Sequence, residues 1–353
     1  MKEQDILAVL AEYSKRVDEI MEQLAPKEFK LSYLERFFGK PRYAYETQSL
    51  TDGISRPFWD LLGRGGKRWR PALTILTYEA LGGTSKDILE FAAIPEIIHN
   101  ATLIVDDVED GSLMRRGAPC IHRIYGVDIA VNAGNALYYI PVHVLLRKLD
   151  PQTAAKLSIL DVEHMVRLSL GQTMEIVWHR GLVDDVSVEQ YLQMCALKTG
   201  SMSRLAVELA CIAAGCGDEV RRELGEFGES IGVAFQIQDD LLNLFGEERK
   251  YGKEVGGDIT EGKKTILTVY AMRHLQPEDA ARLKEILAMH TQDGSLIAEA
   301  IELVRRSGAD KYAREVAVRI LSESWAVVER LLKPSEARDK LAMLCRFLIE
   351  RSM

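Results

Sequence analysis

The sequence predicts an all-α protein that folds as a single large helical bundle. Apolar residues recur at helical spacing in one segment after another along the 353 residues. The breaks between these segments are short and are marked by glycine or proline. No segment shows the alternation of a β-strand, and no proline- or serine-rich linker divides the chain. A succession of helices joined by short loops is typical of a helical bundle.

The first predicted helix covers residues 3–24, where Ile6, Leu10, Val17 and Met21 recur on one face. After it, Pro26 and the glycine and proline near residue 40 predict short helices and loops. A basic glycine-rich turn at 63–71 then opens a helix that continues through Tyr78. Further helices are predicted at 86–110, 127–149, 151–180, 187–215, 217–245, 260–274, 277–290, 295–307, 309–332 and 335–351. We expect an N-terminal helical extension at 1–55 and one domain at 56–353.

Composition narrows the classes of function. The net charge is −8 and the isoelectric point is about 5.6, which argues against nucleic acid as a partner. Five cysteines without a Cys-x-x-Cys pair indicate reduced thiols in a cytosolic chain. The charged N-terminus does not resemble a secretory signal. No run reaches 18 uninterrupted apolar residues, so we expect no transmembrane segment, although an apolar substrate could bring the protein to a membrane surface.

Two acidic clusters each follow an apolar helical run. The first is Asp106-Asp107-Val108-Glu109-Asp110, in which Asp106 and Asp110 share one face of a helix. The second, Asp239-Asp240-Leu241-Leu242-Asn243, repeats the pattern. A single cluster of this kind is commonly a solvated helix end. Two of them, each closing an apolar helix, predict a site for Mg²⁺, which prefers oxygen ligands and is shared with substrate phosphates.

Basic residues accompany both clusters. Lys67, Arg68 and Arg70 follow glycines and precede a helix, where backbone N–H groups also favour an anion. The turn is not a Walker A loop, because leucine and arginine stand where that motif needs glycine and Ser or Thr. The other basic positions are Arg115, Arg116, Lys198, Lys253, Lys263 and Lys264. Each alone could be a solvated charge. Together they predict two diphosphate sites, one bound through metal and one through side chains.

One motif suggests a different metal site. Glu96 and His99 have the Glu-x-x-His spacing of di-iron bundles. Such sites need two copies of the motif, and the sequence has no second one. His99 is therefore interpreted as a core or substrate-facing residue.

The ordered set of motifs resembles the trans-isoprenyl diphosphate synthases, which elongate prenyl chains head to tail. The motifs fall between residues 60 and 275: the basic turn 66–71, Ile98-His99, the first acidic cluster with Arg115-Arg116-Gly117, Gly171-Gln172, Lys198-Thr199-Gly200, the stretch 235–240, Lys253, and Asp258 to Lys263. The stretches 99–126 and 240–243 look most like geranylgeranyl diphosphate synthases. The resemblance implies an isoprenoid-synthase bundle around a deep apolar cavity, with 56–353 as the synthase domain.

The resemblance also implies roles for individual residues. It assigns Mg²⁺, about three ions per site, to Asp106, Asp107, Asp110, Asp239 and Asp240, which together with Lys198 are the expected catalytic residues. It assigns isopentenyl diphosphate to Gly66, Lys67, Arg70, His99, Arg116 and Phe235. It assigns the allylic diphosphate to Arg115, Lys198, Thr199, Gln236, Lys253 and Lys263. Asn243 departs from the family, because many members have a third aspartate there, and its role as a ligand is doubtful. A homodimer is also implied.

The length of the product depends on the residues ahead of Asp106. In short-chain relatives, bulky aromatics five or four positions before that aspartate form the floor of the tunnel. Here these positions are Ala101 and Thr102, which are small, so the sequence predicts a product longer than farnesyl diphosphate, with 20 carbons. Tyr138 and Tyr139 are candidates for a lower floor, or else ordinary core aromatics.

Other functions are weighed against this one. A synthase of C25 or longer chains, or a farnesyl diphosphate synthase, would use the same machinery. A terpene cyclase would pair the first cluster with an Asn-Asp/Ser/Thr-Glu triad in place of a second aspartate cluster. A non-catalytic subunit of a heteromeric synthase tends to lack these aspartates. A metal-storage bundle would leave the basic residues unexplained.

Overall fold

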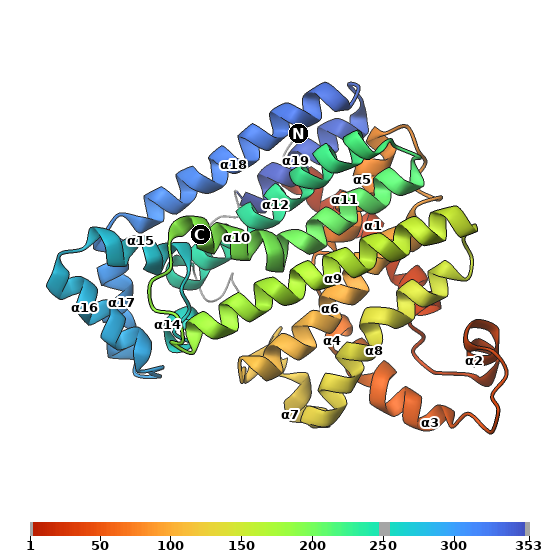
Figure 1. Cartoon of the computed structure of the whole chain (residues 1–353), viewed down its shortest axis with the longest axis horizontal. Helices are drawn as coiled ribbons and strands as arrows, with labels where there is room; N and C mark the ends of the chain where they lie inside the picture. Colours follow the sequence, from red (N-terminus) through yellow and green to blue (C-terminus); the bar gives the residue numbers. More distant parts are fainter. Residues whose placement is uncertain (1–2, 247–254, 350–353) are drawn as a thin grey trace. The chain divides into compact units, whose positions relative to one another are not determined.

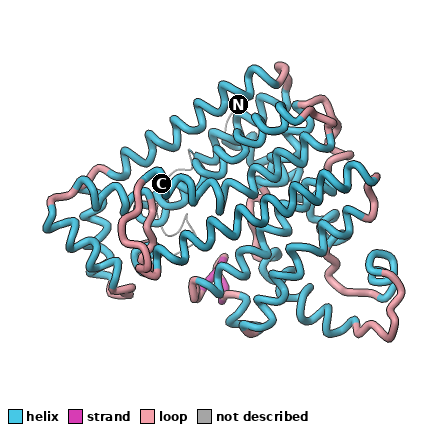
Figure 2. The backbone as a smooth tube through the Cα atoms, viewed as in Figure 1, coloured by secondary structure: helices cyan, strands magenta, loops and turns pink. Residues whose placement is uncertain are grey.

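The computed structural model confirms the all-α prediction (Figure 1). It describes residues 3–246 and 255–349. Within these ranges, extended structure is confined to one antiparallel hairpin of β1 (Met114–Arg115) and β2 (Ala118–Pro119) (Figure 2). The hairpin was not predicted, because strands of two residues are too short to show an alternating pattern.

The chain divides into two compact units, which are described separately. Unit 1 contains the described residues of Met1–Val162, Leu205–Arg222 and Leu332–Leu344. Unit 2 contains those of Glu163–Arg204, Glu223–Leu331 and Cys345–Met353. Residues 3–24 belong to unit 1. They contact the rest of that unit, since the hydroxyl of Tyr13 donates to Glu79 at 3.0 Å. The predicted boundary at residue 55 stays a prediction.

The helices of unit 1 carry the first acidic cluster and the basic turn. They are α1 (Glu3–Leu24), α2 (Leu31–Phe38), α3 (Thr47–Leu50), a π-helical turn (Thr51–Ser55), α4 (Arg56–Gly63), α5 (Trp69–Ala80), α6 (Leu89–Glu109), α7 (Ile121–Tyr125) and α8 (Val127–Leu146). Four further helices have residues in both units: α9 (Pro151–His179), α11 (Ser201–Ala213), α12 (Asp218–Phe245) and α19 (Glu336–Ile349).

The helices of unit 2 carry the second acidic cluster. They are α10 (Val188–Cys195), a π-helical turn (Ala196–Gly200), α14 (Gly257–Thr260), α15 (Ile266–His274), α16 (Pro277–Ala288), α17 (Gly294–Arg306) and α18 (Ala309–Leu331). The helix predicted at 187–215 is therefore interrupted by the π-helical turn, and the one predicted at 260–274 begins later. At Thr265 a capping box with Thr268 starts α15, which explains the later start.

The core of unit 1 is built around α6, whose residues from Phe91 to Ile98 are all buried. α8 packs closely against it at Gly134. A Cβ at Gly134 would lie 2.4 Å from Val105 Cγ2 and 3.2 Å from the carbonyl oxygen of Ala101. Because glycine has no side chain, the two helices can approach each other at this point.

The cysteines agree with the expectation of free thiols, and one apolar helix is long enough to be compared with a membrane span. All five cysteines are free thiols, and four of them are buried. One described helix, α8, is long and apolar enough to cross a membrane by length and composition, and 44% of its apolar window is buried. A core helix of a folded domain meets the same two criteria.

Candidate active site

The first acidic cluster lies at the carboxyl end of α6, with Asp110 as the residue that ends the helix. One carboxylate oxygen of Asp106 and one of Asp110 lie within 4.8 Å of each other. Both side chains are partly exposed. Two negative charges at this distance repel each other, so the arrangement favours a cation between or beside them.

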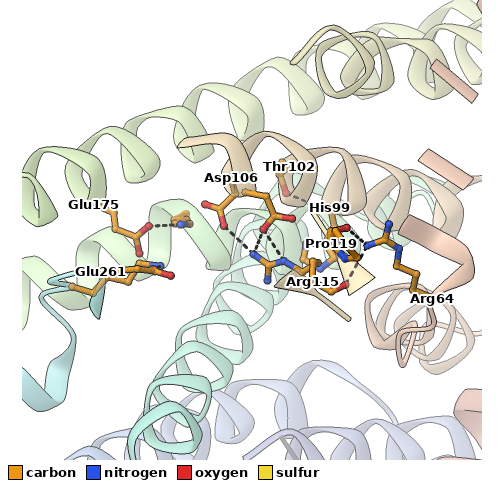
Figure 3. Close-up of polar contacts among 11 residues, drawn as sticks. Arg64, His99, Thr102, Asp106, Arg115, Pro119, Glu175 and Glu261 are labelled. Atoms are coloured by element: carbon orange, nitrogen blue, oxygen red, sulfur yellow. Dashed lines mark hydrogen bonds and ion pairs between the residues drawn. The ribbon is translucent and has the colours of Figure 1, made fainter. Parts of the chain in front are cut away.

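Asp107 points differently from its neighbours. It is fully buried, and its Oδ1 accepts hydrogen bonds from Arg115 Nε at 2.8 Å and Arg115 Nη2 at 2.5 Å. Figure 3 shows Arg115 beside the end of α6, where its Nη2 also lies 3.8 Å from Asp106. Burial alone would lower the pKa of Arg115, but the Asp107 carboxylate more than reverses this and holds the pKa above its usual value. Arg115 therefore carries a positive charge beside the acidic cluster.

One oxygen of Asp107 remains for another partner. Its Oδ2 is buried and accepts no hydrogen bond from the residues that the structure describes. Buried carboxylate oxygens are normally satisfied. The oxygens that lie close together are those of Asp106 and Asp110, and oxygen ligands of this kind suit a divalent cation. The first cluster thus has the donor chemistry that Mg²⁺ requires.

The hairpin that carries Arg115 is held by Arg64. Its Nη1 donates to the carbonyl oxygens of Arg115 at 3.2 Å and of Pro119 at 2.8 Å (Figure 3). The turn residues Arg116 and Gly117 have φ values of +52° and +74°. Two successive residues with positive φ form the tight turn that suits a two-residue hairpin loop. Such a conformation is strained for arginine, and strain of this kind is common at functional sites.

The basic turn before α5 uses its charges in two ways. Arg68 has a φ of +49° and is buried, and it forms ion pairs with Glu96 at 3.3 Å and Asp18 at 3.1 Å. It therefore holds the turn against α6 and α1 and is not available to an anion. Glu96 also accepts from Asn100 Nδ2 at 3.0 Å. These contacts account for the Glu-x-x-His motif without a di-iron site.

Three arginines of unit 1 lie close enough to His99 for their charges to act on it. Burial lowers the pKa of His99 well below its usual value, and the charges of Arg70, Arg116 and Arg115 lower it further. The imidazole is thus neutral, and the three arginines supply the positive charge. Burial also lowers the pKa of Arg116 to about 10. Such a concentration of cations favours an anionic ligand.

Gly66 allows these guanidinium groups to come close to the backbone. Its φ is +135°, and a Cβ there would lie 2.6 Å from Arg68 Nη1 and 3.3 Å from Arg116 Nη2. Lys67, the next residue, is exposed. The predicted group Gly66, Arg70, His99 and Arg116 therefore does come together within unit 1.

The second acidic cluster repeats the division seen in the first. Asp239 is partly exposed, whereas Asp240 is only 4% exposed. Tyr191 Oη donates to Asp240 Oδ2 at 2.5 Å, and Gln236 Nε2 donates to Asp240 Oδ1 at 2.9 Å. Burial raises the pKa of Asp240 to about 7, although both hydrogen bonds oppose the shift. The predicted substrate contact Thr199 joins this group, because its hydroxyl donates to Gln236 Oε1 at 2.8 Å.

Lys198 lies in the π-helical turn between α10 and α11. Its side chain forms an ion pair with Glu175 of α9 (Figure 3). Gly171 makes this contact possible, since a Cβ there would lie 2.4 Å from the backbone nitrogen of Lys198. π-Helical turns within helices are frequent at functional sites. The predicted Gly171-Gln172 and Lys198-Thr199-Gly200 motifs thus belong to one packed corner of unit 2.

Asn243 has a structural partner. Its Oδ1 accepts from the backbone nitrogen of Asp258 at 3.0 Å, and its carbonyl oxygen accepts from Gly256 at 2.8 Å. The nitrogen of Lys263 in turn donates to the carbonyl oxygen of Asp258 at 2.9 Å. Asn243 therefore anchors the turn that leads to Lys263, whose side chain pairs with Glu261 at 2.5 Å. The other predicted lysine, Lys253, lies outside the described residues.

The four residues predicted to set product length differ in burial. Ala101 is buried, and Thr102 donates to the carbonyl oxygen of His99 at 2.8 Å (Figure 3). Burial raises the pKa of Tyr138, and Glu109 and Asp106 raise it further, which places its hydroxyl towards the acidic end of α6. Tyr139 is 64% exposed and so is not part of the apolar interior of unit 1. The predicted substrate contact Phe235 is half-buried on α12.

Several residues of the site were not predicted. Tyr191, Glu175, Arg64 and Glu96 contact residues that lie between 23 and 51 positions away in the sequence. A tyrosine or glutamate on an amphipathic helix carries no local signal of such a role. Only the Arg116-Gly117 pair contained a clue, since glycine in a short basic segment indicates a tight turn.

Fold and site together define a class of protein. An all-α chain holds two oxygen-rich acidic clusters, a group of arginines around a neutral histidine, and a second group of polar donors beside Asp240. Acidic clusters can bind a divalent metal ion, and cationic and polar donors can bind diphosphates, so these groups are typical of an enzyme that acts on diphosphates with a divalent metal ion.

The comparisons give the family. The polyprenyl synthetase family model matches residues 51–304, so the chain belongs to the polyprenyl synthetase family and is a trans-prenyltransferase. A short chain isoprenyl diphosphate synthase of Methanothermobacter thermautotrophicus is 36% identical over 82% of this chain and 88% of the relative. A geranylfarnesyl diphosphate synthase of Aeropyrum pernix is 31% identical over 88% and 98%.

Solved structures agree. Geranylgeranyl pyrophosphate synthetase of Pyrococcus horikoshii has a TM-score of 0.85 and 29% identity, with all of both chains covered. The geranylgeranyl pyrophosphate synthase of Corynebacterium glutamicum, in complex with isoprenyl diphosphate and magnesium, has a TM-score of 0.81 and 25% identity, with 95% of this chain and 98% of that chain covered. The predicted family is therefore confirmed.

The buried pair of Arg68 and Glu96 yields a test of the basic turn. We expect Arg68→Met to lower the free energy of unfolding by about 3–5 kcal/mol, because it leaves the Glu96 carboxylate buried without its cation. Urea unfolding followed by circular dichroism measures the change. Lys27→Met is the control, since it removes the exposed Lys27–Glu22 pair and should change stability by less than about 1 kcal/mol. Equal losses in the two variants would contradict the role given to Arg68.

Proposed function

We propose that this enzyme condenses isopentenyl diphosphate with allylic diphosphates (dimethylallyl, geranyl and farnesyl) and releases geranylgeranyl diphosphate. The observation that carries the 20-carbon product is the small, buried Ala101 five residues ahead of Asp106, followed by Thr102. Neither side chain can close an apolar tunnel as an aromatic ring would. The Pyrococcus horikoshii structure of a geranylgeranyl synthetase supports the same product.

The acidic residues would hold the metal. Asp106, Asp110 and Asp239 are the partly exposed carboxylates, and the buried Oδ2 of Asp107 accepts no hydrogen bond from the described residues. About three Mg²⁺ ions per site are implied by the family. Bound Mg²⁺ supplies positive charge that stabilises the departing diphosphate.

The two diphosphates would bind at different groups of cations. Isopentenyl diphosphate would be bound by Gly66, Lys67, Arg70, His99 and Arg116, and the family resemblance adds Phe235. The allylic diphosphate would be bound by Arg115, Lys198, Thr199, Gln236, Lys253 and Lys263. Among these, Arg115, Lys198 and Lys263 already pair with carboxylates. The pairs hold the cations in position before the substrate arrives.

The chemistry follows from this distribution of charge. Cations around the allylic diphosphate favour cleavage of the C–O bond, which leaves a delocalised allylic carbocation. The double bond of isopentenyl diphosphate attacks the cation, a C–C bond forms, and a proton is lost to the released diphosphate. Apolar side chains around the site must exclude water, which would capture the cation.

The same site could form two other products, of 25 or of 15 carbons. A geranylfarnesyl product of 25 carbons is favoured by the similarity to the Aeropyrum pernix enzyme. A farnesyl product would need a floor close to Asp106, which Ala101 and Thr102 do not provide. A terpene cyclase and a non-catalytic subunit are not supported, because the chain keeps both aspartate clusters and the isopentenyl-site cations.

The product assay tests the proposal directly. Purified protein with isopentenyl diphosphate, Mg²⁺ and each allylic primer in turn should give a C20 product, identified by chromatography after dephosphorylation. Removal of the metal with a chelator should abolish turnover, and added Mg²⁺ should restore it. A C15 or C25 main product would overturn the C20 assignment, and absence of condensation with any primer would overturn the function.

Ala101→Phe tests the residues that set the length. A phenyl ring five residues ahead of Asp106 should block the tunnel and shift the main product from C20 to C15. Because Ala101 is buried beside Gly134, thermal unfolding must show that the variant folds. Thr102→Phe, at a partly exposed position, is the second variant, and the same shift is expected. An unchanged product distribution in a folded variant would contradict the tunnel assignment.

We also propose that the enzyme is a homodimer in the cytoplasm. The support is an apolar stripe on the exposed face of α9, formed by Ile159, Val162, Val166 and Leu170 at spacings of three and four residues. Each of these side chains is at least 53% exposed. Exposed apolar stripes of this kind are typical of interaction surfaces, and the family resemblance implies a second copy of the chain as the partner.

Val166→Glu should break the dimer, because the charge would be buried in the proposed interface. The sedimentation coefficient should then fall to that of a single chain. Val318→Glu is the matched control, since Val318 on α18 is also 53% exposed but lies outside the stripe. A wild-type protein that sediments as a single chain at micromolar concentration would rule the proposal out.

A further inference from the structure

Three hydrogen bonds link Tyr191 to the predicted allylic-site residues. Tyr191 Oη donates to Asp240 Oδ2 at 2.5 Å, Gln236 Nε2 donates to Asp240 Oδ1 at 2.9 Å, and Thr199 Oγ1 donates to Gln236 Oε1 at 2.8 Å. All four residues belong to unit 2 and come from α10, the π-helical turn and α12. Tyr191 is 1% exposed and Asp240 4%, whereas Gln236 and Thr199 are only half-buried. The network therefore extends from the core to the accessible side of the site.

Tyr191 and Gln236 donate directly to Asp240, and Thr199 donates to Gln236, so all three hydrogen bonds run in the direction of Asp240. Asp240 accepts from both Tyr191 and Gln236, so the side of the Gln236 amide that faces it is the NH₂ group. With the amide reversed, Oε1 would lie against a carboxylate oxygen, and two acceptors would repel each other. The Gln236 carbonyl oxygen consequently faces Thr199 and takes the hydroxyl proton. The network thus has one consistent direction.

This direction decides what the accessible end offers to a ligand. Gln236 uses one of its two amide hydrogens on Asp240 and has a second one to donate. A half-buried amide that presents N–H is suited to an anion, whereas a reversed amide would present oxygen and repel it. The orientation of Gln236 is therefore a condition for binding a diphosphate at this point.

Tyr191 stabilises the group on which that orientation depends. Asp240 is buried, and the charged form of a buried carboxylate needs strong donors. Tyr191 and Gln236 each occupy a different oxygen of this carboxylate. Without the phenol, Oδ2 would lose its donor, and the carboxylate could rotate. The position of Gln236 would then no longer be unique.

We propose that Tyr191 is a positioning residue for the allylic diphosphate, and that it acts through Asp240 on the orientation of Gln236 and Thr199. The proposal rests on the proposed function, because it assigns the ligand of that same site. Tyr191 itself contacts neither substrate nor metal. Its hydroxyl fixes the direction of a hydrogen-bond network whose far end binds the ligand.

Tyr191→Phe tests the proposal, because it removes the hydroxyl and keeps the ring. Binding of inorganic pyrophosphate with Mg²⁺, measured by calorimetry without turnover, should weaken roughly tenfold, as expected for loss of a hydrogen bond to a charged group. In turnover, KM for the allylic diphosphate should rise by a similar factor, while KM for isopentenyl diphosphate changes less than about twofold. Pyrophosphate affinity equal to wild type would overturn the inference.

Tyr13→Phe is the matched control. Tyr13 is also a buried tyrosine whose hydroxyl donates to a carboxylate, that of Glu79 at 3.0 Å, but it belongs to unit 1. We expect this variant to bind pyrophosphate as wild type does. Thermal unfolding of both variants separates loss of fold from loss of binding. A tenfold loss in Tyr13→Phe as well would show a general effect of stability and contradict the specific role.

A double-mutant cycle identifies the route. If Tyr191 acts through Gln236, then Tyr191→Phe should change pyrophosphate affinity less than about twofold in a Gln236→Ala background. The full tenfold effect in both backgrounds would contradict that route. The wild-type measurements separate this inference from the proposed function. Failure of wild type to bind pyrophosphate or to condense isopentenyl diphosphate overturns the function, whereas an active wild type with an unaffected Tyr191→Phe overturns only the role of Tyr191.

Discussion

A carboxylate taken out of water must receive strong donors, and this constraint shapes both acidic clusters. In each cluster the second aspartate is buried: Arg115 holds Asp107, and Tyr191 with Gln236 holds Asp240. Because these side chains are fixed from within the protein, the helix end around them is fixed as well. The preceding aspartates are left partly exposed, where a metal ion and its ligand can reach them. The paired aspartates of the sequence thus divide into an anchored residue and an available one.

The positive charges show a similar division. Arg68 forms ion pairs with Glu96 and Asp18, and these ion pairs anchor the glycine-rich turn. The charges of the arginines around His99 add to the effect of burial, and together they keep the histidine neutral. Such a group is costly in the absence of an anion, so the protein retains it where a ligand supplies the missing charge. Glycines at the contact points let the cations and helices come close enough for this arrangement.

Membership of the polyprenyl synthetase family fits this site, and the structure adds detail particular to this chain. Where many relatives have a third aspartate, Asn243 accepts a backbone hydrogen bond from Asp258 and anchors a turn. The neutral amide therefore replaces a negative charge with a structural contact. Ala101 and Thr102, five and four positions ahead of Asp106, are small, and Tyr138 is half-buried.

The sequence by itself determined the helical class, most helix boundaries, the two acidic clusters and the family, because periodicity, glycine breaks and motif order are local properties of the chain. It could not show that Arg68 is an internal ion-pair partner, that Tyr191 holds Asp240, or that a two-residue hairpin carries Arg115. These facts depend on residues far apart in the chain that meet only after folding. The tertiary structure alone decided which of several identical charges is buried and paired and which is left to bind a ligand, since burial is a property of the packed chain and not of any segment.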